Sequence, residues 1–154
     1  MTLGEALNRR SDLQKRIAQL QDRVSSSVLV QEGDEPPENA EELLAELDSL
    51  CGELQLLIAQ INLTNASTKL PTGETVTEGL ARRDVLALRQ GGLRAAVRAA
   101  RGEDRLLRYS RSEIRMVRQI GVRDTQDRID ALAKEQRELE GLLQEHNWTT
   151  TLIE

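Results

Sequence analysis

The segment LLAELDSLCGELQLLIAQI, residues 43–61, decides the fold, because its apolar side chains recur with the period of a packed helix. Six of them follow one another at intervals of 4, 3, 4, 3 and 4: Leu43, Leu47, Leu50, Leu54, Leu57 and Ile61. This is the heptad spacing of a coiled-coil seam. A second row, Leu44, Cys51 and Ile58, widens the apolar stripe. The sequence therefore predicts a helix that packs on more than one neighbour.

The rest of the chain extends this pattern into a mainly α fold of antiparallel helical hairpins with coiled-coil-like packing. Thr2 and Glu5 have the spacing of a capping box, and Pro36 and Pro37 exclude a helix between the first two helical segments. One domain, 1–154, is predicted to contain the following elements: helix 2–28, helix 38–64, a small β hairpin or loop 67–77, helix 78–101, a strand or short helix 111–120, helix 124–146 and a docked tail 147–154.

Four features of these elements carry specific expectations. Thr77 is predicted to cap the third helix, and the glycine pair at 91–92 to mark a kink or a close backbone approach. In the last helix, Gln136 interrupts a second heptad seam and is expected to form a buried polar layer. Trp148 is expected to dock with the tail.

Composition restricts the function. The chain has 154 residues, a net charge of −5, no Phe and only one Tyr and one Trp. An acidic chain is a poor general partner for nucleic acid. No apolar run approaches the ~20 residues that span a bilayer, and the first residues have no signal-peptide core. We expect a cytoplasmic protein without stable membrane insertion.

Charge is segregated along the sequence. Residues 24–68 contain nine acids and no Lys or Arg, whereas residues 81–123 contain twelve arginines and four acids. The simplest arrangement places the acidic arm against the arginine-rich block, within one subunit or between subunits. The alternative is that each block is a solvated helix face.

Catalytic chemistry finds little support. Cys51 belongs to the apolar stripe and is expected to be a buried structural thiol, and His146, the only histidine, falls at a predicted helix end, where it can interact with the last carbonyls. A divalent metal remains possible at Asp84 and Glu113, two isolated acids among arginines, although ion pairing explains both better.

The stretch RYSRSEIR, 108–115, holds the only tyrosine. Ser110 and Glu113 have capping-box spacing, which favours a short helix, while the β-rich run that follows fits a strand. In either case arginines, among them Arg111 and Arg115, cluster around Tyr109, as is typical of protein interfaces.

Several motifs together, GEAL, DLQKRI, VQEG, INLTN, RRDVL, RYSRSEI and NWTTTLIE, resemble a family of bacterial proteins, some of which are named septicolysin. The resemblance implies a mostly helical homo-oligomer, a hexamer, with a possible metal site. It also marks a set of polar positions: Asn62, Asn65, Arg83, Asp84, Ser110, Arg111, Glu113 and Asn147.

The sequence thus predicts a cytoplasmic, non-enzymatic protein that assembles with copies of itself into a homo-oligomer, a hexamer by the resemblance. A metal- or small-ligand-binding protein is the alternative. A cytolysin of the septicolysin type is favoured less, because a lysin must insert apolar surface into a membrane and the chain offers no such segment.

Overall fold

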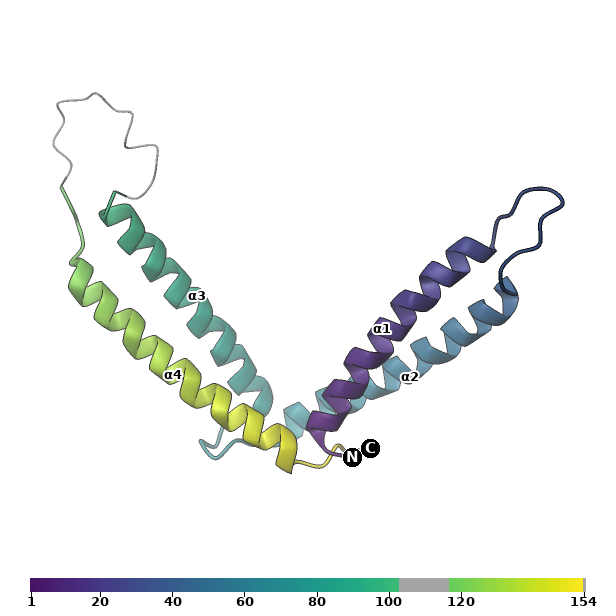
Figure 1. Ribbon diagram of the computed structural model, residues 1–154. Helices are drawn as coiled ribbons and strands as arrows, with labels where there is room; N and C mark the ends of the chain where they lie inside the picture. Colours follow the sequence, from purple (N-terminus) through teal and green to yellow (C-terminus); the bar gives the residue numbers. More distant parts are fainter. Residues whose placement is uncertain (103–116, 154) are drawn as a thin grey trace, which may run out of the picture. The chain divides into compact units, whose positions relative to one another are not determined.

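Four α-helices make up the computed structural model, which describes residues 1–102 and 117–153. They are α1 (Leu3–Ser27), α2 (Ala40–Ser67), α3 (Val76–Ala100) and α4 (Val122–Thr149) (Figure 1). The mainly α class predicted from the sequence is confirmed. The chain divides into two compact units: unit 1, Met1–Lys69 with Gln144–Glu154, and unit 2, Leu70–Leu143.

Side-chain caps fix where the helices begin. Thr2 and Glu5 form the predicted capping box, with the Thr2 amide donating to Glu5 Oε2 at 2.7 Å. Asn39 caps α2 by accepting from the amides of Glu41 and Glu42. These side chains satisfy amides that have no partner within the helix.

The start of α3 differs from the prediction. Thr75, not Thr77, is the N-cap, because its hydroxyl accepts from the Glu78 amide and the Glu78 carboxylate accepts from the Thr75 amide at 2.7 Å. The glutamate at the third helical position therefore selects the threonine three residues before it. The other predicted boundaries differ from those of the structure by one to three residues, within ordinary fraying of helix ends.

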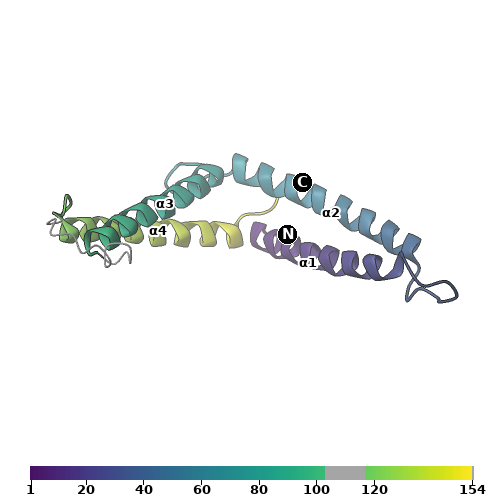
Figure 2. The same cartoon turned by 90° about the horizontal axis from the view of Figure 1, so that it is seen from above.

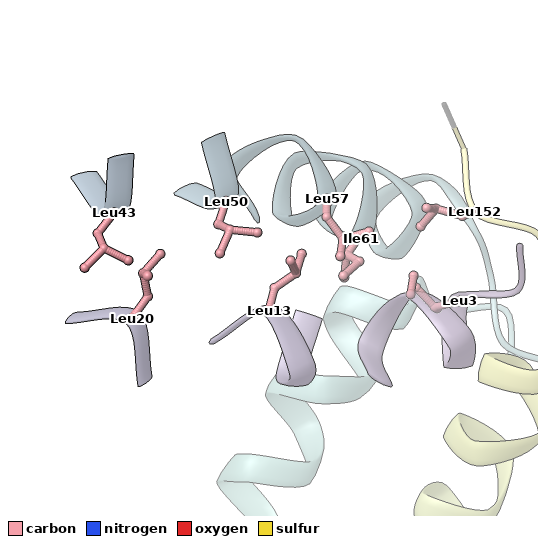
Figure 3. Packing of buried hydrophobic residues seen from close by; sticks show 9 residues of the cluster. Leu3, Leu13, Leu20, Leu43, Leu50, Leu57, Ile61 and Leu152 are labelled. Atoms are coloured by element: carbon pink, nitrogen blue, oxygen red, sulfur yellow. The ribbon is translucent and has the colours of Figure 1, made fainter. Parts of the chain in front are cut away.

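An aliphatic seam joins α1 to α2 in unit 1. The two helices run antiparallel and lie side by side (Figures 1 and 2). Leucines of α1 point toward leucines of α2 across the seam (Figure 3). The buried members of this core are Leu3, Ala6, Leu13, Leu20, Leu43, Leu50, Leu57, Ile61 and Leu152. Every buried member of the predicted α2 heptad row belongs to it, so burial of this row holds the hairpin together.

The two ends of the chain pair within unit 1. The Leu3 amide donates to the Thr150 carbonyl at 2.8 Å and the Leu152 amide to the Met1 carbonyl at 3.0 Å. Leu152 is buried, and the Ile153 amide donates to the buried hydroxyl of Thr64 at 3.0 Å. The tail is therefore docked.

Trp148 docks only partly. One side of its ring lies close to Gly4, where an added Cβ would stand 3.0 Å from a ring carbon, yet the residue is 59% exposed. Gly4 thus provides space for the indole, and most of the ring is left to solvent.

In unit 2 the small β hairpin or loop expected at 67–77 is a tight turn, in agreement with the loop alternative. The Leu70 amide donates to the Glu74 carbonyl and the Gly73 amide to the Leu70 carbonyl, so residues 70–74 form a turn and no strand. Gly73 has a φ of +92°, which favours glycine. The turn places Leu70 against Gly79, where a Cβ would lie 2.7 Å from the leucine methyl. In α3 the close approach is therefore at Gly79, whereas nothing described lies within 4 Å of a Cβ at Gly91 or Gly92.

A polar layer crosses the α3–α4 seam. Gln90 is buried and donates to Gln136 Oε1 at 2.6 Å, Arg94 donates to Gln90 Oε1, and Gln136 donates to Glu140 Oε1. The polar layer expected at Gln136 is present, with its hydrogen bonds satisfied by neighbours. Such a layer fixes the register of two helices because a shift would leave buried amides unpaired.

The predicted strand or short helix at 111–120 falls partly outside the described residues. Its described part, 117–120, is neither helix nor strand and is exposed. Residues 111–116 lie outside the described chain.

Removing a seam leucine tests the role of the aliphatic core. Leu20 is 1% exposed, so Leu20→Ala should lower the free energy of unfolding of unit 1 by about 2–5 kcal/mol. Leu29→Ala is the matched control, because Leu29 is 86% exposed, and should change it by less than about 0.5 kcal/mol. Urea denaturation followed by circular dichroism measures both values; equal effects would contradict the seam as the source of stability.

Candidate functional site

The polar positions singled out in the sequence do not form one site within the described residues. Asn62 and Asn65 lie on α2 in unit 1, the first exposed and the second half-buried. Arg83 is half-buried on α3 in unit 2, and Asn147 is half-buried near the end of α4 in unit 1. The remaining predicted residues, Tyr109, Ser110, Arg111, Glu113 and Arg115, lie outside the described chain.

The metal hypothesis at Asp84 gains no support from its surroundings. Asp84 is exposed, and its carboxylate accepts two hydrogen bonds from the neighbouring Arg83, at 2.8 and 3.0 Å. The other proposed ligand, Glu113, is not described. Among residues 1–102 and 117–153, no group of three or more His, Cys, Asp or Glu side chains could hold a metal ion.

One flank of the α1–α2 seam carries a ladder of ion pairs, here called the charged side. Arginines at seven-residue intervals on α1 meet acids of α2 and the connector before it: Arg9–Glu53 at 2.6 Å, Arg16–Glu46 at 2.6 Å, and Arg23–Glu38. The hydrogen bond from Arg23 lowers the pKa of the Glu38 carboxyl. These pairs are exposed, so they set helix orientation and register more than they add stability.

Within the described residues of one chain, the acidic arm does not pair only with the arginine-rich block 81–123, because its Glu46 and Glu53 pair with α1 arginines. The reason is proximity: the arginines of α1 flank the seam with α2, so their guanidinium groups lie next to the acids of α2. The alternative that the two blocks meet between subunits stays a prediction.

The opposite flank, here called the uncharged face, has a different character. Its residues also recur at the positions that flank the seam. They are Leu7, Ser11, Gln14, Ala18, Gln21 and Ser25 from α1 and Leu44, Cys51, Gln55, Ile58 and Asn62 from α2. None of these carries a charge, but the α2 column that contains Gln55 and Asn62 begins with two acids, Glu41 and Asp48. Leu44 and Ile58 are 42% and 36% exposed.

Cys51 is exposed, so the expectation of a buried thiol was wrong. The apolar row of Leu44, Cys51 and Ile58 lies beside the seam rather than in it, since the seam positions of α2 are filled by the leucine row that faces α1. The sequence predicted a second neighbour for this row; in the described residues of one chain the row has none.

A groove lies between α3 and α4 in unit 2, with a volume of about 610 Å³. Apolar side chains of both helices line it, among them Leu93 and Leu132, and the exposed Leu88 lies beside them. Two arginines, Arg89 from α3 and Arg128 from α4, also line it. Sequence periodicity gave no sign of this groove.

His146 connects three segments of unit 1. Its Nε2 lies 3.0 Å from Thr68 Oγ1 and 3.0 Å from Thr150 Oγ1. The Thr68 hydroxyl donates its own proton to the Thr64 carbonyl, so its oxygen accepts from His146 and Nε2 carries the ring proton. The histidine therefore binds hydroxyls rather than the last helical carbonyls, because α4 continues to Thr149.

The burial of His146 makes unit 1 sensitive to acid. Burial lowers the pKa of the imidazole from its ordinary 6.5, so the unfolded chain takes up the proton at a higher pH than the folded one. Stability is then complete above about pH 6.5 and decreases as the pH falls from there toward the lowered pKa.

His146→Gln tests this effect. The glutamine amide can still donate to the threonine hydroxyls but does not titrate, so between pH 7.5 and 5.5 wild type should lose more thermal stability than the variant. Melting temperatures of both proteins at the two pH values measure the difference, and the carboxylates common to both cancel. Parallel losses would contradict a titrating His146.

The geometry defines an all-α protein built of helical pairs, with one uncharged hairpin face and one arginine-lined groove. The chain belongs to the family of unknown function DUF6847, whose model matches residues 10–152. It is also similar to a solved structure described as a functionally unknown conserved protein from Corynebacterium diphtheriae, with 36% sequence identity over 99% of each chain and a TM-score of 0.87. No curated protein matches the sequence.

These comparisons overturn the septicolysin resemblance. The family that matches nearly the whole chain has no assigned function, and nothing found connects it to septicolysin. Within the described residues no helix has both the length and the apolar character to cross a bilayer.

Proposed function

We propose that this protein is a non-enzymatic protein of the cytoplasm that acts as a homo-oligomer, through a two-fold contact between the uncharged faces of two α1–α2 hairpins. The number of six subunits came only from the septicolysin resemblance and is not retained. What remains is a self-association that the hairpin itself motivates.

The observation that carries the proposal is the exposed heptad row of Leu44, Cys51 and Ile58. A row with this spacing packs against another helix when one is present. On the charged side the arginines and glutamates already pair with each other, so a second copy there would have to compete with these ion pairs. The uncharged face has no such pairs, and the acids beside its row are Glu41 and Asp48 near the start of α2.

The charges beside the row favour an antiparallel arrangement. The α2 positions next to it are Glu41 and Asp48 toward the start of the helix, and Gln55 and Asn62 toward its end. A parallel pair would place acids against acids, whereas an antiparallel pair places them against amides. About a two-fold axis, Leu44 then meets Ile58 of the second copy, and the central Cys51 meets its own equivalent.

The area of the face is adequate. The 25 residues of α1 give a strip about 38 Å long, and at a width of roughly 16 Å each copy contributes ~600 Å². The total, ~1,200 Å², lies at the lower end of specific protein interfaces.

The catalytic candidates support a non-enzymatic role. Cys51 lies on the proposed interface, and the ring Nε2 of His146 is held by Thr68 and Thr150. Cys51 and His146, the candidates for a nucleophile and a general base, thus have different partners and do not act as a catalytic pair in this proposal. The lone thiol also suits a reducing compartment such as the cytoplasm.

Cross-linking through Cys51 tests the two-fold contact. A short bismaleimide should convert the native protein at micromolar concentration to a covalent dimer of twice 17.3 kDa, and Cys51→Ser should abolish this product. In a Cys51→Ser background, a mixture of Leu44→Cys and Ile58→Cys chains should cross-link more efficiently than either alone. Preferential linking of Leu44→Cys to itself would contradict the antiparallel arrangement.

A charge placed on the row should separate the copies. Ile58→Glu should remove the two-fold contact and so lower the mass measured in light scattering below that of wild type, because two carboxylates would be buried next to leucines. Leu56→Glu is the matched control: it makes the same change on the same helix, at a position 68% exposed and outside the row. It should leave the mass unchanged. A wild type that is itself monomeric would refute the proposal.

A further inference from the structure

The groove of unit 2 differs electrostatically from the charged side of unit 1. In unit 1 every arginine of the ladder meets a glutamate. In the groove, Arg89 and Arg128 come from opposite helices, and neither pairs with a carboxylate of the described residues. Glu135, the one acid that lines the groove, lies 3.8 Å from Arg82. Two cations beside an apolar floor attract a partner that has both carboxylates and apolar side chains.

The connector between α1 and α2 has this combination. Three consecutive apolar residues are exposed in it, Val28 at 56%, Leu29 at 86% and Val30 at 38%. Three exposed acids follow at once, Glu32, Asp34 and Glu35, and no described cation pairs with them. Adjacent exposed apolar residues are unusual on a soluble surface and commonly mark an interaction site.

We propose that the connector of one copy, residues 28–35, docks in the α3–α4 groove of another copy. Its apolar residues would cover the groove floor beside Leu88, and its carboxylates would pair with Arg89 and Arg128. Guanidinium groups suit this role, since they bind carboxylates bidentately.

This contact differs in kind from the two-fold contact. It joins two different surfaces, so it is head-to-tail, and repetition of such a contact gives rings or filaments. It rests on the proposed self-assembly only in that the partner is again a copy of this chain. Together, the two contacts would produce assemblies larger than a dimer. The head-to-tail contact would also explain why acidic and basic residues are concentrated in different parts of the sequence.

Charge reversal on each surface is the first part of the test. The groove variant is Arg89→Glu with Arg128→Glu, and the connector variant is Glu32→Arg, Asp34→Arg and Glu35→Arg. All five positions are exposed, so the helices should fold. In light scattering at low salt, wild type should exceed the mass of a dimer and both variants should lose the larger species. Arg98→Glu with Arg123→Glu, the same charge change at exposed positions outside the groove, should behave as wild type.

Mixing the two variants is the decisive part. In an equimolar mixture, the reversed connector matches the reversed groove, and the native connector of the other chain matches the native groove. The larger species should therefore return, and should weaken in high salt because the attraction is screened. A contact between connector and groove of the same chain would not be restored by mixing, so failure of the mixture to recover overturns the proposal.

The same samples separate this inference from the proposed function. The groove and connector variants should still give the Cys51 cross-link, since neither alters the uncharged face. A wild type no larger than a dimer overturns the head-to-tail contact and leaves the two-fold contact intact. If native mass spectrometry then finds a small anionic molecule retained by this dimer, the groove binds that molecule and not the connector. Larger species that depend on the groove but give no Cys51 cross-link overturn the two-fold contact alone.

Discussion

Burial of leucine, isoleucine and valine along narrow seams is the interaction on which the rest of the structure depends. The buried apolar residues of the described chain are all aliphatic. Such side chains fill a seam between two helices, but they give each helix only one stripe to bury. The fold therefore consists of helical pairs in which most of each helix surface remains exposed, and the character of the residues beside each seam decides what can bind there.

Both helical pairs are held by an aliphatic seam, but the residues on either side of the seam differ between the two units. In unit 1 one flank has a complete set of Arg–Glu pairs, which specify the antiparallel orientation of α1 and α2. In unit 2 a glutamine layer at Gln90 and Gln136 takes over the task of fixing register. Unit 2 also has the ion pair Arg82–Glu135 between α3 and α4, but Arg89 and Arg128 have no described carboxylate partner and are available for other partners. The surfaces left without a partner are the basis of both proposals.

Much of the fold follows from periodicity in the sequence. The heptad row of α2, the capping box at Thr2 and the polar position Gln136 within a heptad row are visible in the spacing of nearby residues, so they can be recognised without a structure. The partner of Gln136, Gln90 on another helix, is not visible in this way. Features that depend on distant segments could not be predicted in this way. Gly79 gives no local sign that Leu70 lies against it, and Cys51 belongs to an apolar stripe wider than the seam that one partner helix can cover.

The candidate site was less predictable than the fold. The residues chosen from the sequence were polar ones, such as Asp84 and Asn62, whereas the features that stand out in the structure are an uncharged face and a groove with unpaired arginines. The uncharged face and the groove are each formed by residues of two neighbouring helices. A single sequence does not show which side of one helix faces which side of the next. The cluster around Tyr109 remains a prediction, since it lies outside the described residues.

Unit 1 is made of two stretches that are far apart in the sequence, and this limits the order in which the molecule can fold as it is synthesised. The α1–α2 hairpin has all of its seam once residue 69 has left the ribosome, but the partners of Met1 and Leu3 are Leu152 and Thr150, which are translated after the whole of unit 2. A nascent chain must hold this end of the hairpin unfinished until residues 150–153 have been synthesised. These residues therefore act as a latch, and a ribosome that stops before them releases a hairpin whose open end still exposes the apolar surface that Leu152 would cover.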